Sequence, residues 1–172
     1  MEHARDEKVL EWLRRAHESA TWTASVCSGA LILAAAGLLE GKRATSHWAA
    51  LPALKAMGVK AVGDERIVRE GDIVTCAGVS AGIDLGLWLA GQIGGDGRAK
   101  AIQLSMEYDP QPPYDSGHMS KASATTKAAA IALMSKDLVK PTQLRAMSGL
   151  LWDHAISTAR ARRKRKLVPS RG

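Results

Sequence analysis

Cys27 is the residue whose type and surroundings in this chain most favour covalent chemistry. It lies in the stretch Ser-Val-Cys-Ser-Gly-Ala, after β-branched and aromatic residues and before a run rich in alanine and leucine. The β-branched and aromatic residues favour a strand, and the run rich in alanine and leucine favours a buried helix. Small residues, Ser25 and Gly29, stand two positions before and two positions after the cysteine. This spacing is typical of a nucleophile elbow, a strained strand-to-helix turn that lifts a reactive side chain clear of a sheet.

A thiol at the start of a helix has chemistry that an ordinary thiol lacks. Unpaired amide N–H groups and the positive end of the helix dipole both favour the thiolate. The N–H groups of Ser28 and Gly29 would also stabilise negative charge that develops on a bound substrate. The alternative is that Cys27 is a small, inert core residue, as most free cysteines are. The elbow spacing and the change from strand to helix favour the nucleophile.

The elements around Cys27 are predicted from the spacing of the apolar residues. Val9, Leu10, Leu13 and Ala16 share one face of a helix over residues 6–18. The other predicted elements are a strand over 22–26, a buried helix after the cysteine with Gly37 and Gly41 at its end, an extended segment over 42–46, a helix over 49–57, short strands over 60–62, 66–68 and 72–75, and helices over 81–93, 97–107, 124–135 and 142–160. The turn Glu70-Gly71-Asp72 predicts that the last two strands form a hairpin. Ser80 is the expected N-cap of the helix over 81–93. The alternation of strands and helices predicts an α/β sandwich with a mainly parallel sheet.

Length and charge indicate one folded domain with a basic end. The chain has 172 residues, of which 46% are hydrophobic and 24% charged, with a formal net charge of +7. Seven Lys and Arg residues follow residue 159 and no Asp or Glu does, so the rest of the chain is neutral. We therefore expect a domain over 1–138, a C-terminal helix over 139–159 that packs on it, and a basic, disordered tail over 160–172. We expect no nucleic-acid partner apart from contacts that this tail would make.

The sequence gives no sign of a membrane segment or of a prosthetic group. The longest apolar run, residues 30–39, is too short to span a bilayer, and no basic-then-apolar leader opens the chain. We therefore expect a cytoplasmic protein. Cys27 and Cys76 do not form a Cys-x-x-Cys pair, and in the cytoplasm both are expected to be reduced thiols. We expect neither a metal ion nor a cofactor.

Four motifs, in order along the chain, resemble the ThiJ/PfpI superfamily, whose fold is like that of class I glutamine amidotransferases. They are the elbow, Gly37-Leu-Leu-Glu-Gly-Lys-Arg-Ala-Thr-Ser-His-Trp48, Gly78-Val-Ser-Ala-Gly-Ile-Asp84 and Leu104-Ser-Met-Glu-Tyr-Asp-Pro-Gln-Pro-Pro-Tyr114. The last two are most similar to the isonitrile hydratase branch. The amidase-like domains of AraC-type regulators share some of these motifs. The resemblance covers residues 6–138.

The resemblance implies a flavodoxin-like sandwich, a homodimer and a small-molecule substrate. It implies that the thiolate of Cys27 adds to the terminal carbon of an isonitrile, and that protonation and attack by water then release an N-substituted formamide. Ser28 follows the nucleophile, and its N–H and hydroxyl would face the pocket. The further pocket residues that the resemblance implies are Gly29, His47, Gly78 and Val79. For His47, a structural, hydrogen-bonded role is the alternative to pairing with the thiol.

The chain departs from the family pattern before Cys27. Only one helix and one strand are predicted there, whereas family members have several βα units that include an acidic residue acting at the thiol. The early acids of this chain have the spacing of surface charges on a helix. The sequence therefore predicts a fold that lacks the first βα units through N-terminal truncation. Loss of a positioned acid would cost about 10²–10⁴-fold in rate, so activity would require a general acid supplied from elsewhere.

Two functions other than isonitrile hydration are consistent with these residues. The first is a non-catalytic module of the same fold that senses a ligand or forms a dimer. The second is a redox sensor in which Cys27 forms a sulfenic acid. The segment after the proline-rich stretch contains only two predicted helices and the basic tail, which is too little for the two helix-turn-helix units of an AraC-type DNA-binding domain.

Overall fold

The computed structural model of the chain describes residues 2–138, 148–149, 152, 155–156 and 159. The predicted helices over 139–159 and 142–160 fall largely outside the described residues, and the predicted tail over 160–172 falls entirely outside them. Within the described part, no helix combines the length and the apolar character needed to cross a membrane.

A three-stranded sheet with the order β1-β5-β4 lies at the centre of the structure. Its strands are β1 (Thr23–Val26), β4 (Ile67–Glu70) and β5 (Ile73–Cys76). β1 and β5 run parallel, with Val26 opposite Cys76, whereas β4 and β5 form the antiparallel hairpin that the sequence predicts. A second, parallel pair consists of β2 (Arg43–Ala44) and β3 (Lys60–Ala61). Two of the three strand pairings are parallel, in agreement with the predicted mainly parallel sheet.

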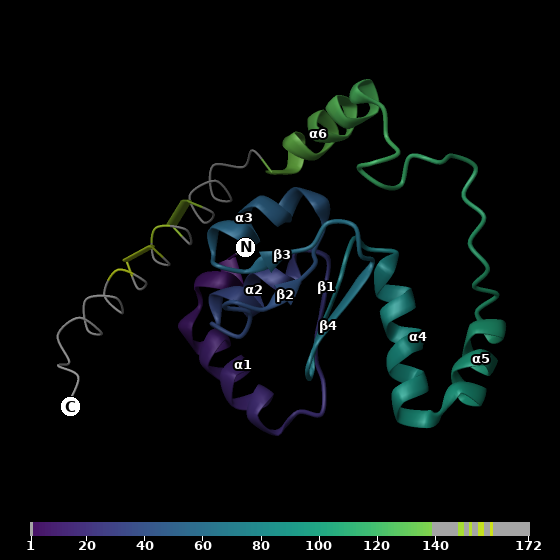
Figure 1. Cartoon of the computed structure of the whole chain (residues 1–172), viewed down its shortest axis with the longest axis horizontal. Coiled ribbons are helices and arrows are strands. Elements are labelled where there is room, and N and C mark those ends of the chain that lie inside the picture. Colours follow the sequence, from purple (N-terminus) through teal and green to yellow (C-terminus); the bar gives the residue numbers. More distant parts are fainter. Residues whose placement is uncertain (1, 139–147, 150–151, 153–154, 157–158, 160–172) are drawn as a thin grey trace, which may run out of the picture.

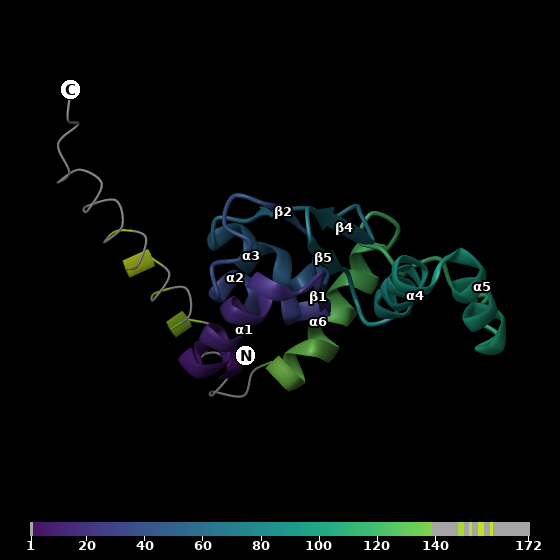
Figure 2. The ribbon, with the colours of Figure 1, turned by 90° about the horizontal axis from the view of Figure 1, so that it is seen from below.

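The helices lie on both sides of this sheet, as Figures 1 and 2 show. On one side are α1 (Glu7–Ser19), α2 (Ala30–Ala35) and α3 (Leu51–Ala56), and on the other are α4 (Ala81–Gly94) and α5 (Asp96–Ser105). A long segment leads from α5 back to α6 (Ala124–Leu138), which lies near α3. Short 3-10 turns complete the described elements: η1 (Glu2–Arg5), η2 (Cys27–Gly29) and η3 (Trp48–Ala50).

The central strand β5 separates two apolar cores. Successive side chains of a strand point to opposite faces, so Ile73 joins Leu31, Leu54 and other residues of α2 and α3, whereas Val74 joins Leu85 of α4. All four residues of β5 are buried. This burial fixes the position of Cys76, the last residue of the strand, directly beside the elbow.

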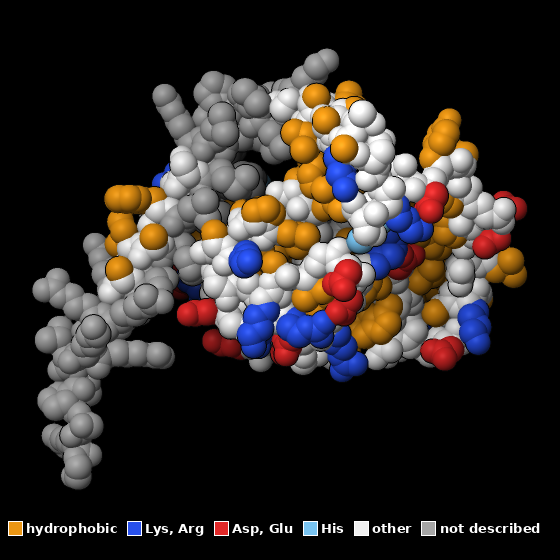
Figure 3. Space-filling model, turned by 45° about the horizontal axis from the view of Figure 1, so that its top comes forward, with side chains coloured by type: hydrophobic (Ala, Val, Ile, Leu, Met, Phe, Trp, Pro, Cys, Tyr) orange, Lys and Arg blue, Asp and Glu red, His pale blue; other side chains and the backbone are white. Residues whose placement is uncertain are grey.

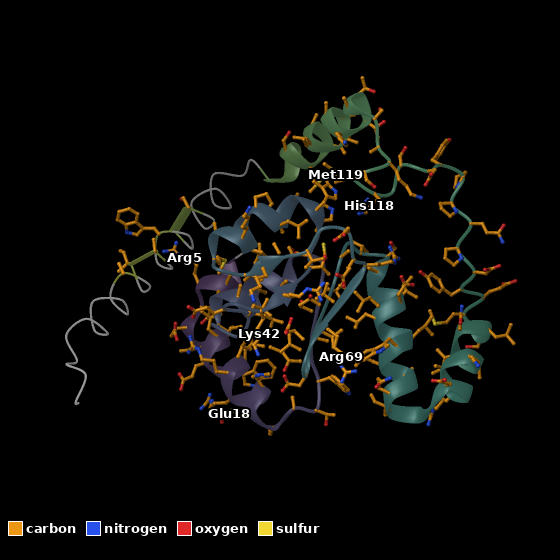
Figure 4. All side chains as sticks on the ribbon, in the orientation of Figure 1. Arg5, Glu18, Lys42, Arg69, His118 and Met119 are labelled. Carbon is orange, nitrogen blue, oxygen red and sulfur yellow. The ribbon has the colours of Figure 1, made fainter. Side chains whose placement is uncertain are left out.

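Aromatic and cationic side chains close the edge of the core beneath α4. The rings of Trp22 and Trp88 meet edge to face, with 5.0 Å between their centroids. The guanidinium carbon of Arg69, which is labelled in Figure 4, lies 4.7 Å from the centroid of Trp22. Cation–π contacts of this kind are worth about 0.5–1 kcal/mol at exposed sites. They hold the start of β1 against β4 and α4.

Of two local predictions at helix ends, the one at Gly37 is confirmed and the one at Ser80 is wrong. The helix after the elbow ends at Ala35, before the apolar run does, because Gly37 adopts a φ of 82° and the amides of Gly37 and Leu38 bond back to Ala34 O and Leu33 O. This is a Schellman motif, which terminates a helix whatever the hydrophobicity of the following residues. Ser80 precedes α4 but makes no capping hydrogen bond with its side chain, because its hydroxyl accepts from Arg66 instead.

We predict that Gly37→Ala destabilises the fold by about 1–2 kcal/mol, because a β carbon is strained in the left-handed region. Urea unfolding monitored by circular dichroism measures the change. Gly86→Ala is the matched control: Gly86 lies within α4 with open space around it, so this change is expected to stabilise by about 0.5–1 kcal/mol. Equal effects of the two substitutions would contradict the role assigned to Gly37.

Candidate functional site

Cys27 occupies a strained turn between β1 and η2. Its φ is 58°, in the left-handed region, where a residue other than glycine carries a cost of the order of 1–3 kcal/mol. Two hydrogen bonds hold this backbone: Cys27 N donates to Ala77 O over 2.9 Å, and Ser46 Oγ donates to Cys27 O over 2.6 Å. The predicted strand, turn and helix around Cys27 are thus confirmed. Its role as a nucleophile stays a prediction.

The small residues that flank Cys27 allow the chain to turn closely. Ser25 is buried, and a β carbon added at Gly29 would lie 3.5 Å from Ser25 Cβ. A β carbon at this distance makes an ordinary van der Waals contact, so a side chain longer than a methyl group at position 29 would press on Ser25. The Ser25 hydroxyl has no hydrogen-bond partner among the described residues.

Cys76, the other cysteine, is fully buried and lies opposite Val26 in the sheet. Burial raises the pKa of the Cys76 thiol, and a hydrogen bond from the Cys27 backbone offsets this only in part. Neither cysteine forms a disulfide, and Cys27 is the more accessible of the two. Cys27 is therefore the one of these two thiols that a molecule from solution can reach.

His47 is held by a hydrogen bond that fixes its neutral tautomer. Its Nδ1 accepts from Ala49 N over 3.3 Å, so in the neutral ring the hydrogen resides on Nε2. Burial lowers the pKa of His47. The ring edge at Cδ2, next to Nε2, lies 3.5 Å from the β-carbon position of Gly78. The contacts of the described residues include no hydrogen bond between this ring and the Cys27 thiol, so the observed role of His47 is as a cap of η3.

A cavity of about 350 Å³ opens beside the elbow. Of the predicted pocket residues, His47 and Gly78 line it together. Cys27 is not itself a lining residue, but the two residues that hold its backbone, Ser46 and Ala77, both belong to the lining. The lining does not include the other three predicted residues: Ser28 is exposed, Gly29 is half-buried, and Val79 is 78% exposed.

The remaining walls of the cavity come from residues that the sequence did not indicate. They are apolar residues of the η3–α3 region, a charged segment before β4, and a loop before α6, namely Trp48, Leu51, Gly63, Asp64, Glu65, Arg66, Ser80, Gly117, His118 and Met119. The charged run Asp64-Glu65-Arg66 was the available signal, but such runs are usually solvated surface. Figure 4 shows His118 and Met119 between α6 and α3, above the strand ends.

Two of the charged side chains at this wall, Glu65 and Arg66, are paired with residues of neighbouring elements. Arg66 donates to Asp84 of α4, and this bond raises the pKa of Arg66 further. Glu65 accepts from Arg43 of β2. Among the described residues, no group of three or more His, Cys, Asp or Glu side chains is arranged to hold a metal ion.

Comparison with known proteins identifies the family. The DJ-1/PfpI family profile matches residues 1–92. The chain belongs to this family. Isonitrile hydratase of Pseudomonas putida is 48% identical over 115 residues, which are 65% of this chain and 49% of that protein. The HTH-type transcriptional regulator CdhR of Pseudomonas aeruginosa is 35% identical over 101 residues, which are 58% of this chain and 30% of the regulator. The chain thus spans about half, or less, of the length of these relatives.

Solved structures support the same conclusion. A ThiJ/PfpI family protein of Pseudomonas syringae superposes with a TM-score of 0.75 at 37% identity, covering 87% of this chain and 59% of that one. DJ-1β of Drosophila melanogaster superposes with a TM-score of 0.54 at 21% identity, covering 63% and 57%, which shows the fold alone. The predicted α/β sandwich and the predicted resemblance to ThiJ/PfpI proteins are both confirmed.

We predict that the stability of the protein falls with acidification partly through His47. Its folded-state pKa is lowered below the ordinary 6.5, so the unfolded chain takes up a proton first as the pH falls through that value. His47→Asn keeps a capping acceptor and does not titrate. The stability of the wild type relative to His47→Asn, measured by urea unfolding, should therefore decrease from pH 7.5 to pH 5.5. A difference that is constant over this range would contradict the lowered pKa.

Proposed function

We propose that this protein is a cysteine-dependent isonitrile hydratase that converts an isonitrile and water into an N-substituted formamide. The observation that carries the proposal is the strained Cys27 turn beside a cavity, in a chain 48% identical to isonitrile hydratase over the part that they share. The substrate is a small molecule, and the reaction needs neither a metal ion nor a cofactor.

The chemistry uses the thiolate of Cys27 and three proton transfers, the last of which takes the hydroxyl proton to the departing sulfur. The sulfur adds to the terminal carbon of R–N≡C, and a proton is delivered to that carbon, which leaves a thioimidate, R–N=CH–S–Cys27. Water then adds to the same carbon, and the nitrogen takes up a proton. The C–S bond breaks, which releases R–NH–CHO and returns the thiol.

The elbow and His47 place hydrogen-bond donors where these reaction steps need them. The start of a helix presents unpaired N–H groups, and in this chain Ser28 and Gly29 follow the cysteine. These N–H groups stabilise the negative charge that builds up as the thiolate attacks. The Nε2–H of His47, on the side of the ring away from Ala49, donates a hydrogen bond to water or to the substrate within the cavity.

The cavity also contains a carboxylate that can carry protons. The early acids of the chain lie on α1 or at its start and do not line the cavity. Asp64 and Glu65 do line it, and Glu65 is paired with Arg43. Asp64 has no ion pair within the described residues, so its carboxylate is available to hydrogen-bond a molecule bound in the cavity. We assign it as the proton carrier of this chain, in place of the acid that the resemblance puts before the nucleophile strand.

The proposal extends to a cytoplasmic homodimer. Large apolar side chains are exposed around α4 and α5, with Ile93 81% exposed and Leu104 79% exposed. Figure 3 shows hydrophobic side chains over this end of the molecule. Exposed apolar surface of this kind typically marks an interface. Light scattering coupled to gel filtration measures the oligomeric state.

A second candidate function is ligand sensing without turnover. The match to the transcriptional regulator CdhR favours it, because that relative shares 35% identity with this chain and is named as a regulator. In this reading the cavity binds a small molecule and Cys27 is not required for binding. A redox role for Cys27 is the further alternative, and its product is a sulfenic acid after mild peroxide, detected by mass spectrometry.

We predict that the wild-type protein forms tert-butylformamide from tert-butyl isonitrile and that Cys27→Ala lowers this rate by at least about 10³-fold, since no other group replaces the nucleophile. Gas chromatography of the product measures the rate. Cys76→Ala is the matched control, because Cys76 is buried and has a raised pKa, and it should retain turnover within about threefold.

Turnover, isonitrile binding and peroxide modification, measured on the wild type and Cys27→Ala, separate the three functions. Equal turnover, or none, in the wild type and Cys27→Ala would sink the hydratase. Binding of the isonitrile to both proteins without turnover would favour ligand sensing. Peroxide-dependent modification of Cys27 without isonitrile turnover would favour the redox role.

A further inference from the structure

The segment that connects α5 to α6, residues 109–123, forms a strap across the molecule (Figure 1). Its first end is tied down at Tyr108, whose hydroxyl donates to Asp84 Oδ1 over 2.7 Å. The other oxygen of Asp84 accepts from Arg66, a residue of the cavity wall. The strap thus begins from a fixed point on α4.

The first part of the strap is stiff. Pro110, Pro112 and Pro113 restrict φ to one narrow range and exclude helix. Runs of this kind favour an extended conformation and behave as semi-rigid spacers. A displacement at one end is therefore passed along the strap instead of being absorbed within it.

His118 fastens the second part of the strap to the charged segment before β4. Its Nδ1 accepts from Ser120 N over 3.2 Å, so Nε2 carries the hydrogen and donates to Gly63 O over 3.0 Å. The amides of Lys121 and Ala122 both donate to His118 O over 3.0 Å, which turns the chain at this point. The contact between His118 and Gly63 joins residues 55 apart in sequence.

The fastened strap forms one wall of the cavity. Gly117, His118 and Met119 line it together with His47 and Trp48. The cavity of about 350 Å³ corresponds to the liquid volume of about a dozen water molecules, so it admits a ligand of roughly that number of non-hydrogen atoms. The width of this space depends on where the His118 contact holds the strap.

We propose that the strap is the specificity wall of the cavity, and that His118 sets the size of the group that the cavity admits by holding the strap at Gly63. The identity of the substrate, an isonitrile whose organic group enters the cavity, rests on the proposed function. His118 is a positioning residue, since it acts on the substrate through the strap that it holds.

We predict that His118→Ala raises the ratio of kcat/KM for 4-biphenyl isonitrile to that for tert-butyl isonitrile by about tenfold or more, the range that pocket size commonly controls. A general loss of activity would lower kcat/KM for both isonitriles alike and leave the ratio unchanged, so the ratio reports the size of the admitted group. His118→Gln, whose amide restores a donor toward Gly63 O, should return the ratio toward the wild-type value. Gln111→Ala is the control: its side chain bonds only to Asp109 within the strap, so the ratio should not change.

Hydrogen exchange tests the strap without any reference to catalysis. The amides of Lys121 and Ala122 are protected by His118 O in the wild type, and His118→Ala should speed their exchange about tenfold or more, as local opening becomes easier. Unchanged exchange of these amides would overturn the claim that His118 fastens the strap. Faster exchange with an unchanged kcat/KM ratio would overturn its role in specificity.

The two proposals fail in different ways. If the wild type shows no turnover, the hydratase fails, and the same two isonitriles are compared as ligands by calorimetry. A relative gain in affinity for the larger one in His118→Ala then supports the strap as a specificity wall. Equal affinity ratios in the two proteins, or no binding of either isonitrile, would overturn it.

Discussion

The geometry of the site depends on the two hydrogen bonds that clamp the backbone of Cys27. A cysteine does not adopt a φ of 58° without cost, so the surrounding structure must compensate for it. One clamp comes from the parallel register of β1 and β5, which brings Ala77 O to the Cys27 amide. The other comes from the Ser46 hydroxyl on the Cys27 carbonyl. Because both partners also line the cavity, the strain at the elbow and the position of the cavity are set by the same contacts.

The cavity walls come from four parts of the chain that are distant in sequence. The segments around His47, Arg66, Gly78 and His118 meet at the carboxyl end of the parallel strands. Ligand sites in α/β sheets typically lie at this end, since loops that leave parallel strands converge there. Apolar groups from Trp48, Leu51 and Met119 line this space together with the charged segment before β4. The site therefore combines a surface for an organic group with side chains that hold and move protons.

The chain belongs to the DJ-1/PfpI family but covers only part of the length of its relatives. This raises one physical question about catalysis. The match to the isonitrile hydratase of Pseudomonas putida covers 49% of that protein. The elbow, the cavity and the histidine cap are nonetheless built from contacts within the described residues. What distinguishes an enzyme from a binding module on this scaffold is the proton carrier, since addition to an isonitrile carbon and release of a formamide both require protons.

The sequence by itself determined the features that depend on local chemistry. The sizes of Ser25 and Gly29 and the change of composition at Cys27 predicted the elbow, and the turn at Gly71 predicted the hairpin. Gly37 likewise marked the end of α2, where a Schellman contact stops the helix within an apolar run. A local rule erred at Ser80, whose hydroxyl bonds to Arg66 and does not cap α4.

Only the tertiary structure decided the burial of Cys76 and the walls of the cavity. The physical reason is that each rests on contacts whose energy comes from packing between remote segments. The His118 contact with Gly63, 55 residues away, is one that no periodicity or spacing along the chain encodes.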